Sequence, residues 1–357
     1  MLSLLGRRRR QYVEVAPHPV RALILGGGGA RGAYEAGVVA ALTERESFDI
    51  VCGTSIGAVN GMLVAQDEPD RLIHVWSNIS ERGVTQLRPE LSVLVLLWQA
   101  ARGLFSSPFA QKGWHALSLV RALPQLSTTT SLPGILGLFE SANVHEVIEE
   151  IAHFERLSRV FIAGVTNLST GRGESFAYFP PALHEAEMAF HRAEHAEPMT
   201  AENYVGAVCA SAALPPVYEP VEILCADGVA RLFADGGFTN NAPIREAIDA
   251  GATDVTAIFV GPAGVTANHD RAASLLDVAT IMLEANTERM LELDLKLARR
   301  INDDVVAGHA PGKRHINFRI IGPSAPLEHP TLGFNDQEEV NRLFALGYAD
   351  GRQIAAA

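Results

Sequence analysis

The chain has 357 residues, of which 48% are hydrophobic and 20% are charged, and its formal net charge is −12 at pH 7. This composition predicts a globular protein with a substantial core and excludes collagen, disordered chains and small disulfide scaffolds. The excess of acidic residues also argues against nucleic-acid binding, because such binding depends on Lys and Arg that neutralise phosphates. The cysteines, Cys52, Cys209 and Cys225, lie in apolar stretches without metal-ligand spacing and are expected to be free thiols of a reducing compartment.

Residues 1–19 are expected to form an N-terminal tail. Its basic run, Arg7 to Arg10, is interpreted as a solvated segment, with contact to an anionic membrane or a partner as the alternative. Apolar residues precede this run, the reverse of the order in a signal peptide, so we expect a cytoplasmic protein. The longest apolar run, Val93–Trp98, is far shorter than the roughly 20 residues that cross a bilayer. Any contact with a membrane surface is therefore expected to be peripheral and transient.

From residue 20 onward, strand and helix patterns alternate. Two units of strand, turn and helix come first, with strands at 20–25 and 48–52 and helices at 32–45 and 58–66. Further strands are predicted at residues 160–165, 176–179, 217–223, 232–234, 255–260 and 316–321, and further helices at 204–213, 244–250, 274–301 and 337–348. This alternation predicts an α/β protein with helices on both faces of a central sheet.

Two segments interrupt the alternation. Residues 80–140 are apolar, and we expect a helical insert that either belongs to the core or forms a lid that contacts lipid. Residues 180–200 are polar and expected to form an exposed loop; His191 and His195 have a spacing that suits a shared metal in a helix, but a four-ligand set is not evident and no metal site is predicted.

The predicted helix over residues 274–301 is amphipathic, and its apolar face is expected to pack on the core. That face comprises Leu275, Val278, Ile281, Met282, Ala285, Met290, Leu293 and Leu297.

A glycine-rich loop follows the first predicted strand. Its residues, Gly27-Gly28-Gly29-Ala30-Arg31-Gly32, bring backbone N–H groups together at a helix N-terminus, which favours an anion. Dinucleotide-binding proteins share this GxGxxG pattern, but they place an acidic residue after the second strand. This chain has Cys52-Gly53-Thr54-Ser55 there, which argues against a dinucleotide.

The second strand ends in a GxSxG turn, Gly53-Thr54-Ser55-Ile56-Gly57. The glycines remove Cβ atoms that would clash as the turn tightens, so the Ser55 hydroxyl is expected to project into a cleft. Asp235-Gly236-Gly237 follows another apolar stretch, where a carboxylate can accept the proton of a serine hydroxyl. Each motif alone also fits an ordinary turn, but together with the glycine loop they supply the parts that acyl transfer requires.

A catalytic triad would add a histidine, which an α/β-hydrolase places after the acidic residue. The histidines in that part of the chain are His269, His309, His315 and His329, and none stands in a motif typical of a catalytic loop. Only one predicted strand precedes the strand that leads to Ser55, whereas an α/β-hydrolase has several. We therefore expect structural or surface roles for these histidines.

The glycine loop, the GxSxG turn and the Asp-Gly-Gly motif resemble, in order and spacing, the three signatures of patatin-like phospholipases. A fourth segment, Ala210–Tyr218, resembles the stretch that the family carries before its catalytic aspartate, and the resemblance extends from about Arg21 to Val260. It implies a three-layer α/β/α sandwich with a mostly parallel central sheet. A catalytic domain is expected over residues 20–265, and a C-terminal helical extension over residues 266–357 is expected to pack on it.

The resemblance also implies a Ser-Asp dyad in place of a triad. Ser55 would be the nucleophile, Asp235 the base, and the backbone N–H groups of Gly28–Ala30 the oxyanion hole, with Arg31 shaping the loop. The chain would then be a serine-dependent lipid acyl hydrolase of phospholipase A or lysophospholipase type. Its substrate would be a phospholipid or another acyl ester, without a metal or organic cofactor. The alternatives are an acyltransferase to an acceptor other than water and an inert protein that binds a lipid or a phosphate-bearing ligand.

Overall fold

The computed structural model describes residues 18–89, 137–194, 196–261, 275–324, 327 and 329–356. Most of the N-terminal tail, including its arginine run, lies outside these ranges, as do His195 and His269. Residues 90–136, the greater part of the apolar segment at 80–140, also lie outside them. The expectations of a core insert or a lid there therefore stay predictions.

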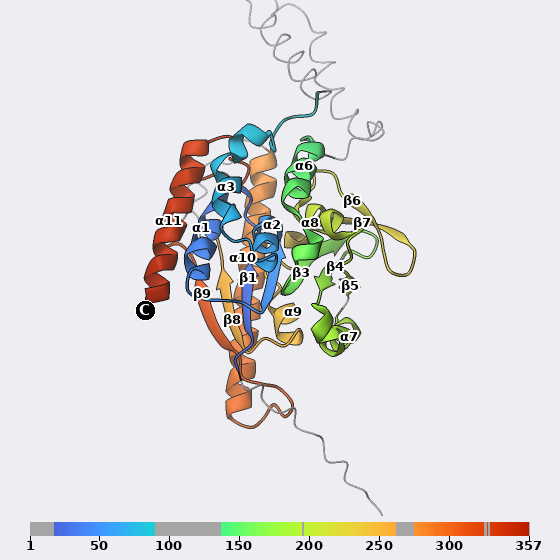
Figure 1. The fold of residues 1–357 in the computed structure, drawn as a ribbon, viewed down its shortest axis with the longest axis vertical. Coiled ribbons are helices and arrows are strands. Elements are labelled where there is room, and N and C mark those ends of the chain that lie inside the picture. Colours follow the sequence, from blue (N-terminus) through green and yellow to red (C-terminus); the bar gives the residue numbers. More distant parts are fainter. Residues whose placement is uncertain are drawn as a thin grey trace, which may run out of the picture.

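Within the described residues, a nine-stranded sheet forms the middle layer (Figure 1). Its strands are β1 (Arg21–Leu25), β2 (Ile50–Thr54), β3 (Val160–Asn167), β4 (Arg172–Tyr178), β5 (Ala196–Pro198), β6 (Val221–Leu224), β7 (Ala230–Asp235), β8 (Asp254–Ile258) and β9 (Asn317–Ile321). The main path runs β5-β4-β3-β2-β1-β8-β9, and its five strands from β3 to β9 are parallel to one another. The β6–β7 hairpin joins the sheet where β7 pairs antiparallel with β3.

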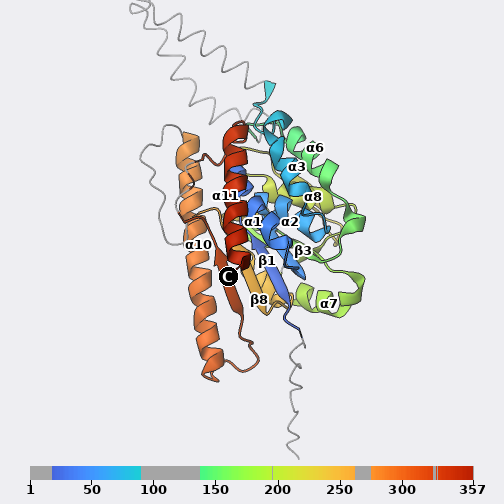
Figure 2. The ribbon, with the colours of Figure 1, turned by 60° about the vertical axis from the view of Figure 1, so that its left-hand side comes forward.

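Helices cover both faces of this sheet (Figure 2). One face carries α1 (Gly32–Thr43), α2 (Ile56–Ala65), α3 (Arg71–Ser77), α6 (Ser141–Ile151), α8 (Tyr204–Ala212) and α11 (Gln337–Ala356). The other face carries α7 (His184–Ala193), α9 (Ile244–Asp249) and α10 (Leu275–Val306). The predicted three-layer α/β/α architecture with a mostly parallel sheet is thus confirmed.

The period of two along the strands produces two separate cores. In β1, Leu23 and Leu25 pack in the cluster that includes α1 and α2, whereas Ala22 and Ile24 pack in the cluster that includes α9. All four side chains are fully buried. The continuous apolar run that predicted this strand therefore reflects burial on both faces, as parallel strands require.

The C-terminal part of the chain is integral to the sheet. It was expected to be a helical extension that packs on the catalytic domain. The strand predicted within it over residues 316–321 is β9, which pairs with β8 and so belongs to the central sheet. Helix α11 lies along α1 (Figure 2). A Cβ atom at Gly347 or Gly351 would collide with the backbone of Tyr34 or Val38, so these glycines permit the close approach of the two helices.

Residues 180–200 were expected to form an exposed loop, which is wrong. They form a short 3-10 helix, α7 and β5. Phe190 of α7 is fully buried against Phe179, with ring centroids 5.4 Å apart. This single buried aromatic side chain attaches α7 to the core, although the other residues of the helix are mainly polar. Nδ1 of His191 is hydrogen-bonded to the carbonyl of Ala196 at 2.9 Å. Among the described residues, no group of three or more His, Cys, Asp or Glu could hold a metal.

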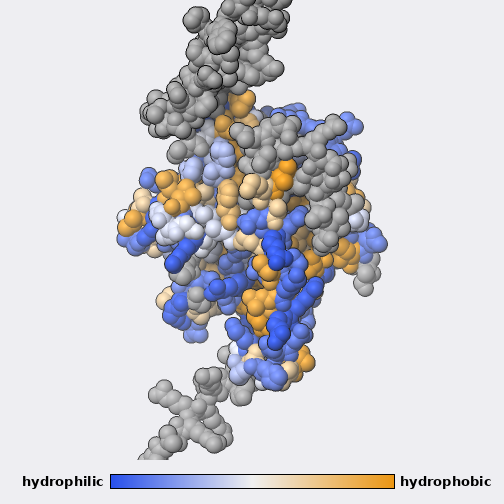
Figure 3. Space-filling model, turned by 180° about the vertical axis from the view of Figure 1, so that it is seen from behind, coloured by the Kyte–Doolittle hydropathy of each residue, from blue (hydrophilic) through white to orange (hydrophobic). Residues whose placement is uncertain are grey.

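Helix α10 departs from the expected buried face at three of its residues. Leu291 and Leu295 pack against the sheet, whereas Met282, Leu293 and Leu297 are exposed. Hydrophobic and hydrophilic residues are intermixed over this side of the molecule (Figure 3). Within the described ranges, no helix is both long and apolar enough to cross a membrane.

The strand predicted over residues 217–223 begins only at Val221. The N–H groups of Val217 and Tyr218 donate to the carbonyl of Leu214, at 2.7 and 2.9 Å. Because these N–H groups are engaged in a turn, they do not pair with a neighbouring strand.

Candidate active site

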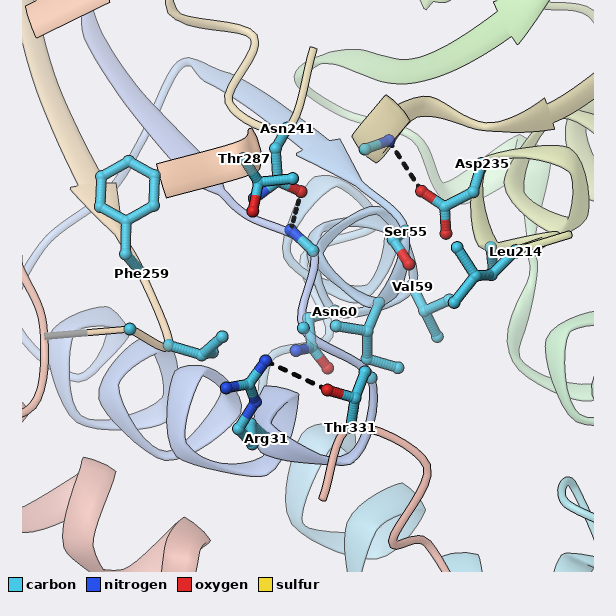
Figure 4. Close-up of a pocket in the computed structure, with 18 of the residues that line it drawn as sticks. Arg31, Ser55, Val59, Asn60, Leu214, Asp235, Asn241, Phe259, Thr287 and Thr331 are labelled. Carbon is cyan, nitrogen blue, oxygen red and sulfur yellow. Dashed lines mark hydrogen bonds between the residues drawn. The ribbon is translucent and has the colours of Figure 1, made fainter. Parts of the chain in front are cut away.

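Ser55 lies in a tight turn between β2 and α2. Its φ is 56°, a backbone conformation that residues other than glycine rarely adopt. A Cβ atom at Gly53 would collide with the carbonyl of Gly57, and one at Gly57 would collide with the carbonyl of Leu25. The two glycines therefore make room for the turn, and the side chain of Ser55 points into a cavity (Figure 4).

The sheet topology brings Asp235 to Ser55. Both β2 and β7 pair with the same edge of β3. The pairing of β2 ends with Thr54 opposite Gly164, and the pairing of β7 begins at the next residue of β3, with Asp235 opposite Val165. The two strands thus meet end to end beside β3. Because Ser55 follows Thr54 directly, two residues that are far apart in the sequence lie next to each other.

Asp235 is 2% exposed, and its carboxylate faces the Ser55 hydroxyl (Figure 4). Its Oδ1 accepts the N–H of Gly237 at 2.7 Å, at the start of the 3-10 helix Gly236–Phe238. Burial raises the pKa of Asp235 to about 6, while hydrogen bonds from Ser55 and from the Gly237 N–H act in the opposite direction. At neutral pH this carboxyl is mostly ionised and can accept a proton.

The glycine loop passes beside Ser55. A Cβ atom at Gly27 would lie 3.0 Å from the Cβ of Ser55, and the N–H of Gly27 donates to Oδ1 of Asn241 at 2.9 Å. Gly29 has a φ of 57° and begins a 3-10 helix that leads through Gly32 into α1. Within the described residues, the N–H groups of Gly28 and Gly29 have no hydrogen-bond acceptor.

Ala30 differs from its expected role in the oxyanion hole. Its N–H donates to the carbonyl of Thr331 at 2.8 Å, so this donor is already engaged. Arg31 lines the cavity, and its Nη2 donates to Oγ1 of Thr331 at 3.2 Å. The structure thus leaves two of the three expected N–H groups for an anion.

The cavity beside Ser55 has a volume of about 590 Å³. On the side of α3, α6 and α8 its wall is apolar and includes Val75, Trp76, Ile79, Val84, Val147, Ile148, Leu214 and Phe334. On the side of α10 its wall combines Phe259, Leu291, Leu295 and Ile320 with Thr287, Glu288, Arg289 and Glu292. A mainly apolar cavity with a few polar groups suits an amphipathic ligand.

None of the described histidines lines this cavity. His309 and His315 are exposed, and Nε2 of the buried His329 is hydrogen-bonded to the carbonyl of Gly333 at 2.9 Å. Among the described residues, the group beside Ser55 that can accept its proton is therefore the carboxylate of Asp235.

Three residues around Ser55 were not assigned a role from the sequence: Ser211, Asn241 and Thr331. Ser211 lies in the Ala210–Tyr218 stretch, so that motif held a signal for it. Asn241 follows the Asp-Gly-Gly motif closely, whereas nothing in the sequence around Thr331 marks it.

Residues 23–248 match the family model described as patatin-like phospholipase. A lysophospholipase NTE1 of Mycosarcoma maydis is 27% identical over 241 residues, and one of Coccidioides immitis (strain RS) is 28% identical over 240 residues. Each alignment covers 67% of this chain but only 10% and 11% of the relative, so the chain spans about a tenth of the length of these proteins. The crystal structure of VipD from Legionella pneumophila aligns with 96% of this chain and 67% of its own at 15% identity, but its TM-score of 0.38 is too low to inform fold or function. Because the family match covers well over half of the sequence, the chain belongs to the patatin-like phospholipase family.

Proposed function

We propose that this chain hydrolyses an acyl ester bond of a lipid, with Ser55 as the nucleophile and Asp235 as the general base. The observation that carries the proposal is the meeting of β2 and β7, which sets a buried carboxylate against a serine in a strained turn at the wall of an apolar cavity. This arrangement provides a nucleophile and a base without a histidine.

In the first half of the reaction, the Oγ of Ser55 attacks the ester carbonyl carbon while its proton passes to the carboxylate of Asp235. The carbonyl oxygen becomes negatively charged and accepts hydrogen bonds from backbone N–H groups of the glycine loop. The tetrahedral intermediate then expels the alcohol, which takes the proton from Asp235 and leaves an acyl group on Ser55.

In the second half, Asp235 takes a proton from a water molecule, and the resulting hydroxide attacks the acyl-enzyme. The second tetrahedral intermediate is stabilised in the same way. It breaks down to the free fatty acid, and the proton on Asp235 returns to Ser55. Every proton in this cycle moves through the single carboxyl group.

The oxyanion hole in this proposal consists of the N–H groups of Gly28 and Gly29. The Ala30 N–H is excluded because it donates to Thr331. Two donors are sufficient, since backbone pairs of this kind stabilise the oxyanion in other acyl-transfer enzymes.

The acyl chain would lie against the apolar wall formed by α3, α6 and α8. Val59 and Leu214 line the cavity beside Ser55 (Figure 4). The relatives named lysophospholipase support a phospholipid with one acyl chain as the substrate. To reach such a substrate, the protein would make transient contact with a lipid surface.

The proposal is tested by incubating the wild type, Ser55→Ala and Asp235→Asn with a lysophospholipid and with diacyl phospholipid vesicles. We expect fatty acid release by the wild type and loss of release in both variants. Activity retained in either variant would contradict the dyad. Added alcohol or thiol acceptors distinguish hydrolysis from acyl transfer, since a transferase would form the new ester or thioester. Binding of the lipid that is equal in the wild type and Ser55→Ala, without turnover in either, would indicate an inert binding protein.

A further inference from the structure

The glycine loop is contacted by a segment that lies beyond the family-matched residues 23–248. The carbonyl of Thr331 accepts the N–H of Ala30 at 2.8 Å, and its Oγ1 accepts a hydrogen bond from Arg31 at 3.2 Å. The same residue also limits Gly29, because a Cβ atom there would collide with the Thr331 carbonyl. Three successive residues of the loop thus depend on one threonine.

Thr331 belongs to a short segment, His329–Phe334, which we call the strap. The strap is braced internally, because Nε2 of the buried His329 is hydrogen-bonded to the carbonyl of Gly333 at 2.9 Å. At its end, Phe334 stacks on Trp76 with ring centroids 6.2 Å apart and an interplanar angle of 14°.

The strap is also connected to the far end of the glycine loop. Nε1 of Trp76 donates to Oδ1 of Asn60 at 2.9 Å, and Nδ2 of Asn60 donates to the carbonyl of Gly32 at 3.1 Å. Beyond the strap, Gln337 at the start of α11 donates to the carbonyl of Trp76 at 2.7 Å. The loop is therefore tied to the strap directly at Ala30 and Arg31, and through Asn60 and Trp76 at Gly32.

This bracing matters because a run of glycines has unusual backbone freedom. Residues 26–29 are all glycine, and fixing each of them in one conformation costs more entropy than fixing other residues. Donors stabilise an oxyanion best when they are oriented before the reaction, so that no reorganisation is needed as charge develops.

We propose that Thr331 is a positioning residue for the oxyanion hole: it holds Ala30 and Arg31 from outside the family-matched region, so that the N–H groups of Gly28 and Gly29 stay directed at the reacting carbonyl. The inference rests on the proposed function. Thr331 takes no part in bond making, and its effect on the reaction passes through the loop.

The test compares Thr331→Val, which keeps the shape but removes the acceptor for Arg31, with Thr331→Ser, which retains it. Gly333→Ala displaces the strap, because its Cβ would lie 2.5 Å from Nε2 of His329. Gly206→Ala in α8 is the matched control, since its Cβ would meet only Ile223, at 3.7 Å. For each variant, kcat, KM and melting temperature are measured. Affinities are measured for a trifluoromethyl ketone, which forms an oxyanion on a serine, and for the fatty acid product, which does not.

We expect kcat to fall about tenfold in Thr331→Val and further in Gly333→Ala, with KM within about twofold. Affinity for the trifluoromethyl ketone should fall by the same factor as kcat, and affinity for the fatty acid should not change. Thr331→Ser and Gly206→Ala should match the wild type.

Wild-type kcat and ketone affinity in both strap variants would overturn the inference. So would equal losses of ketone and fatty acid affinity alongside a lower melting temperature, because these would show a purely structural role. The Ser55→Ala control separates the two proposals. A wild type that hydrolyses no ester, or a Ser55→Ala that does, overturns the proposed function and the inference with it.

Discussion

The backbone N–H of Ser55 donates to the hydroxyl of Ser211 at 3.0 Å, and that hydroxyl donates to the carbonyl of Gly164 at 2.7 Å. Ser211 is fully buried on α8, and Gly164 lies in β3. One hydroxyl thus joins the turn that carries Ser55 to the centre of the sheet. This contact helps to hold a backbone conformation that typically costs about 1–3 kcal/mol.

We predict that Ser211→Ala lowers kcat by at least about tenfold and reduces the free energy of unfolding by about 1–3 kcal/mol, because two buried backbone groups lose their partner. Steady-state kinetics and denaturant unfolding measure these effects. Ser158→Ala is the control, since its hydroxyl also donates to a carbonyl, that of Ala65 at 3.3 Å, but away from Ser55. A kcat within twofold of the wild type would show that the turn holds without Ser211.

The pH dependence of hydrolysis should report Asp235, whose pKa is raised to about 6 by burial. The base must be ionised, so kcat/KM should fall about tenfold per pH unit below pH 6 and reach a plateau above it. An uncharged ester substrate avoids titration of the substrate itself, and circular dichroism at each pH shows that the chain stays folded. A profile that is flat down to pH 4.5 would contradict a role for this carboxyl as the base.

Gly29→Ala should lower kcat by about 10²–10³-fold, the usual effect of losing one oxyanion donor. The substitution forces a Cβ into a position with φ 57° and against the Thr331 carbonyl, so the loop must move. Gly206→Ala serves as the control here as well, and fatty acid binding checks that the cavity is intact. Unchanged kcat in Gly29→Ala would place the oxyanion hole elsewhere.

A second buried carboxyl, Glu35 on α1, should make stability depend on pH. Its Oε1 accepts a hydrogen bond from Nδ2 of Asn60 at 2.8 Å, and burial raises its pKa to about 8. A raised pKa favours the protonated folded state, so this contribution to stability is complete below about pH 4.5 and is lost as the pH rises through 8.

Glu35→Gln removes this titration while keeping the size of the side chain. The free energy of unfolding of the variant minus that of the wild type should therefore rise between pH 5 and 8, by at most on the order of 4 kcal/mol. Above pH 8 this difference should stay constant. Denaturant unfolding at several pH values measures the difference. Parallel curves for the two proteins would show that Glu35 titrates normally.

The local parts of the site could be predicted from the sequence because each is a short motif. The glycines around Ser55 and the Asp-Gly-Gly motif act within a few residues, and the strand before each is a recognisable apolar run. The family resemblance implied that Ser55 and Asp235 act together. The meeting of β2 and β7 along β3, which brings them together, depends on strand pairing over long separations that no local pattern encodes.

Other features depend on tertiary contacts that leave little trace in the sequence. Thr331 contacts Ala30 through its backbone carbonyl, which every residue type possesses, and its hydroxyl contacts Arg31 from 300 positions along the sequence, so no local residue pattern indicates either contact. In α10 the periodicity predicted a buried face with Leu293 and Leu297, but packing on the sheet selects Leu291 and Leu295. A helix with apolar residues on two sides does not itself determine which side is buried.

The central claim is that Ser55 carries the acyl group, and a covalent label tests it most directly. A fluorophosphonate is incubated with the wild type, with Ser55→Ala and with Ser77→Ala, an exposed serine in α3 that serves as the control. Adducts are located by peptide mass spectrometry, and lipid hydrolysis is measured in the same samples. The account predicts one adduct on Ser55 in the wild type and in Ser77→Ala, with hydrolysis lost in proportion to labelling, and neither adduct nor hydrolysis in Ser55→Ala. An adduct on another residue that tracks the loss of activity, or hydrolysis that persists in Ser55→Ala, would contradict it.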